Sequence, residues 1–257
     1  MEYLVISLAA FFTSGLTLFS GFGLGTLLLP AFALFFPVDI AVALTAIVHF
    51  LNNLFKFSLL GKHADKLVVL KFGLTAIAAS FLGARTLIWL AEQQPLFSYQ
   101  ISRRDFHVLP MNLLIAALLI LFALFEVVPR FKNLSFDKKY LPLGGILSGF
   151  FGGLAGHQGA LRSAFLIRCG LTKEAYLATG VVIACVVDLT RLSVYASHFA
   201  TVTLQEHGTL LLAATLSAFT GAFLGNRLAQ KTTLHAIQIL VAVMLFVIAL
   251  GLGAGLI

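Results

Sequence analysis

Two apolar runs, Leu109–Val128 and Thr233–Ile257, are each long enough to cross a lipid bilayer, which takes about 20 residues of helix. They are continuously apolar, whereas the strands of a membrane β-barrel alternate over roughly ten residues. Charged residues make up 11% of the chain, against about 25% in soluble domains, so they cannot cover a water-facing surface. We therefore predict an all-α polytopic membrane protein, which excludes soluble enzymes, nucleic-acid-binding modules and disordered scaffolds.

The net charge of +7 has a simple explanation in such a protein. Lys and Arg concentrate in the cytoplasmic loops of membrane proteins, so an acidic macromolecular partner is not needed to account for them. We expect the lipid bilayer as the surroundings and no binding of nucleic acid. The first residues lack a basic stretch, so no cleaved signal peptide is expected.

Charged breaks divide the chain into eight apolar segments. These are Tyr3–Pro37, Val38–Leu60, Leu67–Leu90, Pro110–Val128, Tyr140–Leu171, Glu174–His198, Gly208–Gln230 and Thr233–Ile257. The first and fifth segments are too long for one upright helix, and each has a glycine cluster near its middle. The fourth and eighth are almost wholly aliphatic and are expected to face lipid.

The glycine clusters indicate an internal repeat. Gly15–Gly25 matches Gly149–Gly159 at an offset of 134, and Lys56 falls on Arg191 at an offset of 135. We predict one membrane domain over residues 1–257 with two homologous halves, about 1–130 and 140–257, joined by a linker over 130–139. The alternative is chance matching among Gly and Leu.

The distribution of Lys and Arg tests how the two long segments cross the membrane. If each enters and leaves on the same side, the N-terminus lies outside. Every cation except Arg85, Arg103, Arg104 and Arg191 then falls at cytoplasmic breaks or helix ends. The positive-inside rule therefore favours two hairpins, either re-entrant or made of two short spans. One hairpin and three spans in each half invert the second half relative to the first, as in many secondary transporters with a midplane site.

The glycine clusters are the first candidate binding site. Glycine lets the backbone turn sharply and brings N–H groups close to a ligand, and the N-terminus of the helix that follows attracts anions. The alternative is that these glycines only allow helices to pack closely. The candidate residues of the two clusters are Ser20, Gly21, Gly23, Gly25, Gly153, Gly156, His157 and Gln158.

The second segment carries a polar stripe. Its members recur at the spacing i, i+3, i+4, i+7 and so share one helical face, which cannot face lipid cheaply. We expect them to line the interior, although Lys56 has the alternative of reaching the cytoplasmic interface. The stripe consists of His49, Asn52, Asn53 and Lys56.

The sixth segment carries the corresponding face, with Asp188, Arg191, Tyr195 and His198. A buried charge is expensive unless it is paired, so Asp188 and Arg191 form either a neutral structural pair or a functional one. In the functional interpretation Arg191 binds an anion, and Asp188 tunes it or carries a proton. Lys56 and Asp188 are therefore candidates for charge balance or coupling.

Several catalytic signatures are missing from the sequence. It contains no phosphate-binding loop of the Walker type, no HExxH and no Cys or His cluster with metal spacing. No cofactor and no metal are expected, and transport is expected to be passive or driven by an ion or proton gradient.

Two stretches resemble the TauE/SafE-type permeases, also called the toluene sulfonate uptake permease family. They are Ser20–Pro30 leading into Ile40–Thr45, and Gly149–Gly159 leading into Glu174–Thr179. The resemblance implies transport of small sulfur-containing anions such as sulfite, sulfonates or sulfoacetate across a bacterial cytoplasmic (inner) membrane. The chain departs from the family pattern at Phe22, His157 and Gln158.

We therefore expect a secondary transporter that binds a small anion at mid-membrane between two broken helices. An anion channel is the first alternative. An intramembrane enzyme acting on lipid is the second, with Asp188 and His198 as its only acid–base pair. A homo-oligomer stays open.

Overall fold

The computed structural model describes residues 1–20, 24–132, 134–201, 206–228 and 234–257. Its helices and strands are α1 (Glu2–Ser20), α2 (Leu24–Ala33), α3 (Val38–Leu60), η1 (Gly61–His63), α4 (Lys66–Ala91), β1 (Phe97–Ile101), β2 (Arg104–Val108), α5 (Pro110–Val127), α6 (Pro129–Lys132), η2 (Lys138–Tyr140), α7 (Leu141–Ala155), α8 (Gly159–Leu166), η3 (Ile167–Cys169), α9 (Lys173–Thr201), α10 (His207–Leu228) and α11 (Leu234–Gly253).

The predicted polytopic all-α fold is confirmed. Helices α3, α4, α9 and α10 are long and apolar enough to cross a membrane, and shorter apolar helices accompany them. The eight predicted segments correspond to α1 with α2, to α3, α4 and α5, to α7 with α8, and to α9, α10 and α11.

The first segment turns back to the end at which it began. The Tyr3 hydroxyl at the start of α1 lies 2.7 Å from the Thr209 hydroxyl. The Phe36 ring, after α2, lies 4.8 Å from the ring of His207. Both partners belong to the first turn of α10, so α1 and α2 form a hairpin with its open end there.

The second segment forms a hairpin in the same way. Asp137, before α7, pairs with Arg168, after α8, at 3.3 Å. The N–H of Phe136 donates to the carbonyl of Ala164 at 3.0 Å. The Asp65 N–H donates to the Thr179 hydroxyl at 2.9 Å, which places the α3–α4 connection at this end too.

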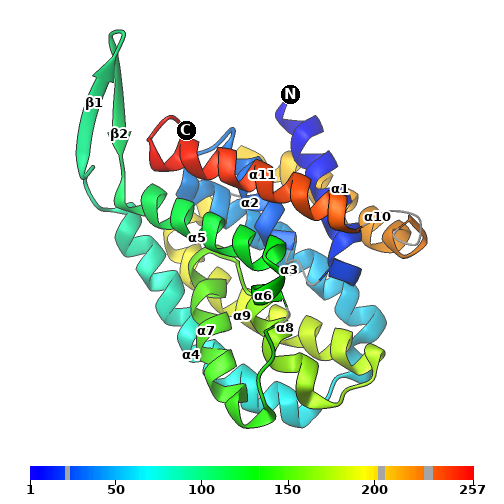
Figure 1. The fold of residues 1–257 in the computed structure, drawn as a ribbon. Helices are drawn as coiled ribbons and strands as arrows, with labels where there is room; N and C mark the ends of the chain where they lie inside the picture. The colour runs from blue at the N-terminus through cyan, green and yellow to red at the C-terminus, as the bar shows by residue number, and fades with distance from the viewer. Residues whose placement is uncertain (21–23, 133, 202–205, 229–233) are drawn as a thin grey trace.

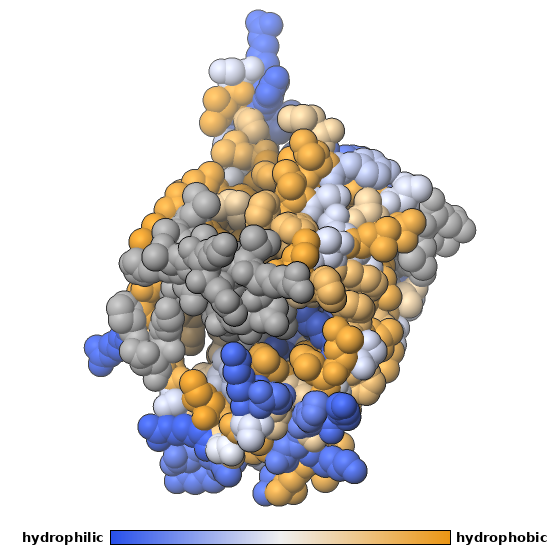
Figure 2. Space-filling model, turned by 90° about the vertical axis from the view of Figure 1, so that its right-hand side faces the viewer, coloured by the Kyte–Doolittle hydropathy of each residue, from blue (hydrophilic) through white to orange (hydrophobic). Residues whose placement is uncertain are grey.

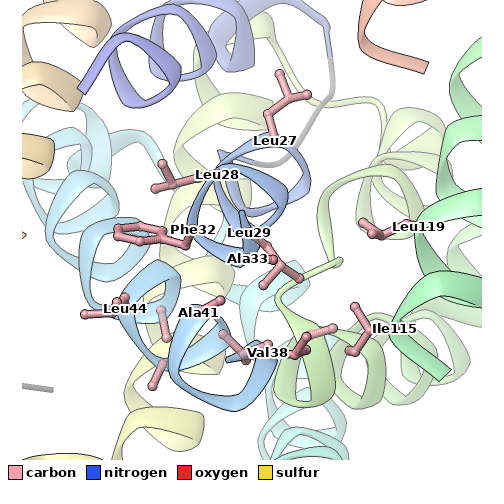
Figure 3. Packing of buried hydrophobic residues seen from close by; sticks show 14 of the residues in the cluster. Leu27, Leu28, Leu29, Phe32, Ala33, Val38, Ala41, Leu44, Ile115 and Leu119 are labelled. Atoms are coloured by element: carbon pink, nitrogen blue, oxygen red, sulfur yellow. The ribbon is translucent and has the colours of Figure 1, made fainter. Parts of the chain in front are cut away.

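The returning arms are too short to span a bilayer. Helix α2 has 10 residues and α8 has 8, or roughly 15 and 12 Å at 1.5 Å per residue, against a hydrocarbon core of about 30 Å. Of the two alternatives given above, these lengths favour re-entrant hairpins, which stay a prediction. Every residue of α2 is buried, and Figure 3 shows Phe32 beside Leu44 of α3 while Ile115 and Leu119 of α5 lie on the other side.

The main contacts between helices stay the same when each helix of the first half is exchanged for the corresponding helix of the second half. Helix α1 packs along α10 as α7 packs along α4, and α3 contacts α10 as α9 contacts α4. Helices α3 and α9 also contact each other, as do α5 and α11 (Figure 1). Each of these contacts has a counterpart when the halves are interchanged, which is what two repeats predict.

Most of the second glycine cluster is helical, which differs from the expectation that its glycines, with Gly153 among the candidates, form a sharp turn. Gly145, Gly149 and Gly153 lie in α7 and face α4. An added Cβ at these positions would overlap the backbone carbonyls of Phe72, Ala76 and Ser80, respectively. These glycines therefore allow two helices to pack closely, the alternative given above.

The α4–α5 connection contains a β-hairpin that the sequence analysis missed. Strands β1 and β2 pair antiparallel from Phe97↔Val108 to Ile101↔Arg104. Ser102 and Arg103 turn the chain with positive φ. The hairpin projects at the end that holds both termini (Figure 1), and the Tyr99 hydroxyl donates to the Ala254 carbonyl at 2.5 Å.

Helix α5 does not simply face lipid as expected. It packs against α11 and buries Ile115, Leu119 and Phe122. An apolar helix gives the same sequence signal whether lipid or protein covers it, so composition could not separate the two cases.

Charge is distributed unequally between the two ends of the molecule. Figure 2 shows hydrophilic residues at the lower end and at the tip of the projecting element, with a hydrophobic band between them. The hairpin end carries Arg103 and Arg104. The opposite end carries the larger group of described cations, which includes Lys62, Lys66, Lys138, Lys139, Arg168 and Lys173.

Candidate functional site

The start of α2 meets the second glycine-rich break inside the protein. An added Cβ at Gly25, in the first turn of α2, would lie 3.0 Å from the carbonyl oxygen of Gly156. Gly156 ends α7 with φ +78°, a left-handed conformation that favours glycine. Gly21, Gly23 and the Ser20 side chain lie outside the described residues.

The second break is confined to Gly156, His157 and Gln158. Gln158 is the N-cap of α8, which begins at Gly159. The first N–H groups of a helix have no partner within it, so α8 directs free donors toward this break. Helix α2 begins close by, and its first residues face the same region through Gly25.

The polar stripe of α3 points into the protein as predicted. His49, Asn52, Asn53 and Lys56 are 4, 0, 6 and 6% exposed. Lys56 is thus buried within the protein rather than extended along its surface. Asn52 is held by α1, because its Oδ1 accepts a hydrogen bond from the Ser14 hydroxyl at 3.0 Å.

Asp188 is the centre of the polar interior, and it connects α9 to both α3 and α8. Its Oδ2 lies 2.6 Å from His49 Nδ1 and accepts from Asn53 Nδ2 at 3.1 Å. Its Oδ1 accepts from Arg191 Nε at 3.0 Å and from Gln158 Nε2 at 3.4 Å. The sequence predicted the pairing with Arg191 but not the contact with His49.

Arg191 lies between this carboxylate and the second break. It is fully buried, and its Nη2 is 2.8 Å from Asp188 Oδ1. An added Cβ at Gly156 would lie 2.8 Å from Arg191 Nη1. Nη2 takes part in this ion pair, whereas Nη1 has no hydrogen-bond partner among the described residues, so Nη1 is the candidate donor to a ligand.

His157 is a second buried donor at the break. It is 1% exposed, and neither ring nitrogen finds a hydrogen-bond partner within the described part of the chain. Its ring stacks on Phe122 with centroids 5.0 Å apart. Phe122 was missed because α5 was assigned to lipid.

Two further cations complete the electrostatics. Arg162 of α8 is partly buried and donates from Nη1 to Gln158 Oε1 at 3.4 Å. Its charge acts on Lys56. Arg162 also interacts electrostatically with Asp188, so in the described part of this cluster Arg162 and Arg191 share that carboxylate.

Tyr195 and His198 have different environments although they share a helical face. Tyr195 is buried, and its hydroxyl donates to the Gly153 carbonyl. His198 is exposed and lies 3.3 Å from Glu92. Ten residues of helix separate His198 from Asp188, roughly 15 Å, so the acid–base pair required by the enzyme alternative is not assembled.

The described residues contain no group of three or more His, Cys, Asp or Glu side chains that could hold a metal ion. Within the described residues, the polar interior contains one carboxylate, Asp188, beside the cations Arg191 and Arg162, a composition that suits an anion.

No curated protein and no solved structure matches the chain with significance. A family model described as sulfite exporter TauE/SafE matches residues 5–252, which include both hairpins and the whole polar interior. Members of that family are permeases rather than enzymes. The chain belongs to the TauE/SafE sulfite exporter family.

Proposed function

We propose that this permease is a secondary transporter of a small sulfur-containing anion of the sulfite, sulfonate or sulfoacetate type. Its binding site lies at mid-membrane, where the two hairpin breaks approach each other. The proposal joins the activity of the family to a buried region that offers hydrogen-bond donors and positive charge.

The excess of buried positive charge is the observation that carries this proposal. Unpaired charge inside a protein is costly, and the single carboxylate of Asp188 compensates only part of the charge on Arg191 and Arg162. A bound anion would supply the missing negative charge. Arg191 is the better placed of the two, because its planar fork matches an oxyanion and its Nη atoms face Gly156.

The other candidate residues take distinct roles. His157 donates to an oxyanion oxygen, and the backbone N–H groups near Gly25 and after Gln158 contribute the dipoles of α2 and α8. Ser20, Gly21 and Gly23 would add donors from the first break. Gly153 allows α7 to approach α4 and positions Tyr195.

His49, Asn52 and Asn53 border the pathway, and two of them, His49 and Asn53, bind Asp188. Lys56 and Asp188 balance the charge of the anion. In this proposal, Arg191 and His157 touch the substrate, whereas His49 and Asn53 hold Asp188 in place.

We further propose that the two halves are inverted repeats in a bacterial inner membrane, with the N-terminus outside. The cation-rich end with Lys138, Lys139 and Arg168 would then be cytoplasmic, as the positive-inside rule requires. The α1–α2 hairpin would open to the outside and the α7–α8 hairpin to the cytoplasm.

A thermal-shift screen of the purified protein tests the substrate class. Sulfite, sulfate, thiosulfate, methanesulfonate and acetate are compared at increasing concentrations. A ligand stabilises the folded state by RT ln(1 + [L]/Kd), so a sulfur oxyanion should raise the Tm progressively while acetate has a smaller effect. Equal shifts with every anion, or none, would contradict the proposal.

Flux into proteoliposomes separates a transporter from an anion channel. A transporter shows saturable flux and exchange of labelled for unlabelled sulfite across the membrane. Unitary currents in a planar bilayer would instead identify a channel.

A further inference from the structure

We propose that His49, held against Asp188, is a proton-binding site whose protonation is coupled to anion binding at Arg191. The inference rests on the proposed function, because it names what accompanies the anion at that same site. The protein would then carry one proton with each anion.

The geometry places Asp188 between two groups that compete for it. His49 Nδ1 approaches Oδ2 at 2.6 Å, and Arg191 approaches Oδ1 through Nε at 3.0 Å. All three residues are at most 4% exposed. One oxygen of the carboxylate therefore interacts with Arg191 and the other with His49, so a change of charge at either residue alters its interaction with the other.

Anion binding changes the balance at this carboxylate. An oxyanion on the Nη edge of Arg191 shares that cation with Asp188, and two negative charges then face one guanidinium. Coulomb interactions are strong in a site with little water, so a second positive charge next to Asp188 becomes favourable. A proton on His49 provides that charge without moving the backbone.

The proton balance of this step is simple. His49 Nδ1–H donates to Asp188 Oδ2, and a proton from water adds to Nε2 to give the imidazolium. It leaves by the same nitrogen when the anion departs. No other bond forms or breaks.

Every neighbouring element contributes to the field at this pair. Asn53 and Lys56 come from α3, Arg191 from α9, and Gln158 with Arg162 from α8; His157 lies in the preceding turn. Arg162 and Arg191 both repel a proton on His49, and Asp188 attracts one. Neutralising Arg191 with an anion therefore tips the balance toward the protonated ring.

Thermodynamic linkage fixes the sign of the effect. If anion binding favours protonation, protonation favours anion binding by the same factor. The affinity for the anion should thus rise as the pH falls through the titration of His49. A proton gradient would then drive the anion in the direction in which protons flow.

Calorimetry on the purified full-length protein counts the protons directly. Sulfite is titrated into the protein at one pH in two buffers that differ in their heat of ionisation, and the difference in measured heat gives the protons bound per anion. Because sulfite itself takes up protons, the wild type is compared with His49→Gln. We expect about one proton fewer in the variant.

The count is a ratio per anion bound, so a loss of affinity in the variant does not affect it. His198→Gln is the matched control, since it changes another histidine on a helix of the same pair that lies at the surface beside Glu92. The control should keep the wild-type count.

Equal proton counts in wild type and His49→Gln would overturn the inference, and loss of the proton in His157→Gln instead would assign it to the other histidine. If His49→Gln does not fold, the wild type alone decides. Its sulfite affinity must rise on acidification by more than the protonation of sulfite provides, and a flat corrected profile would overturn the coupling. Absence of sulfite binding by the wild type would instead contradict the proposed function itself.

Discussion

Helices α3 and α9 occupy equivalent places in the two halves, yet they carry different chemistry. Helix α9 supplies an opposite pair, Asp188 and Arg191, three residues apart. Helix α3 supplies His49 and Asn53, which bind the carboxylate of α9, and a lysine one turn further along. The two helices thus share a backbone arrangement while their charges are unequal.

If the two halves are repeats, as we propose, this difference explains how such a scaffold would obtain a single site. At the offset of 135, Asn53 is the counterpart of Asp188, and the two are in contact at 3.1 Å. Two carboxylates at this place would repel each other at close range, so one half must carry a neutral residue. The two halves pack in a similar way, but the buried ion pair Asp188–Arg191 lies in the second half.

The largest expected difference is between the two hairpins and concerns sidedness. With Cys169 and Cys185 replaced by Ala, single cysteines at Tyr3 and Asp39 should react with an impermeant thiol reagent from one side of the membrane only. A cysteine at Lys139 should react from the other side only. Reaction of Tyr3→Cys and Asp39→Cys from opposite sides would refute the re-entrant first hairpin.

Neutralising the cation of each central helix should show which one binds the anion. Arg191→Gln should lower sulfite flux in proteoliposomes by about 100-fold or more, because breaking a buried charge pair costs roughly 3–5 kcal/mol. Lys56→Gln should lower it by about tenfold, a loss of ~1.4 kcal/mol.

Expression and Tm of both variants control for misfolding. Asp188→Asn with Arg191→Gln removes the buried charges together and should fold better than Arg191→Gln alone. Wild-type flux in Arg191→Gln would remove Arg191 from the mechanism, and equal losses in the two single variants would make α3 an equal contributor.

The two breaks should differ in their tolerance of a methyl group. Gly156→Ala places a side chain at φ +78°, at about 1–2 kcal/mol for the left-handed conformation, and sets its Cβ 2.8 Å from Arg191 Nη1. Gly25→Ala meets only the Gly156 carbonyl at 3.0 Å. The flux should therefore fall more in Gly156→Ala, and the larger Gly156→Leu should block transport. A larger loss in Gly25→Ala would place the constriction at the first break.

The open ends of the hairpins should contribute least. Arg168→Ala removes an exposed ion pair with Asp137 and should cost at most about 1 kcal/mol of stability, with a smaller effect at high salt. Thr209→Val removes the hydroxyl contact with Tyr3, worth roughly 0.5–1.5 kcal/mol, and should be insensitive to salt. A Tm drop larger for Arg168→Ala at high salt would contradict this assignment.

Much of the architecture follows from local signals in the sequence. Apolar runs and charged breaks predicted the helices, because the length and burial of a helix are visible in the hydropathy of its own residues. The i, i+3, i+4, i+7 stripe predicted that His49 and its neighbours face inward for the same reason. The hairpins followed from a global count of cations rather than from any single residue.

Contacts between distant segments were not predictable in this way. The His49–Asp188 contact joins residues 139 positions apart, and neither helix alone indicates its partner. The β-hairpin did leave a signal, since Phe97, Tyr99 and Ile101 alternate with polar residues at a period of two, but it lay in a stretch that was treated only as a break. The helical state of Gly149 and Gly153 depended on the approach of α4, which the sequence does not show.

The β-hairpin described above has a mechanical consequence. Tyr99 binds the Ala254 carbonyl, 155 positions further along the chain, and Gly255 lies against the backbone of His107, so the start of α5 and the end of α11 are tied together through the hairpin. A strap of this kind makes these two helices move together. In a motion that opens the interior to alternate sides, the other helices would therefore move relative to α5 and α11. Removing the β-hairpin should weaken the connection between these two helices without changing the polar interior.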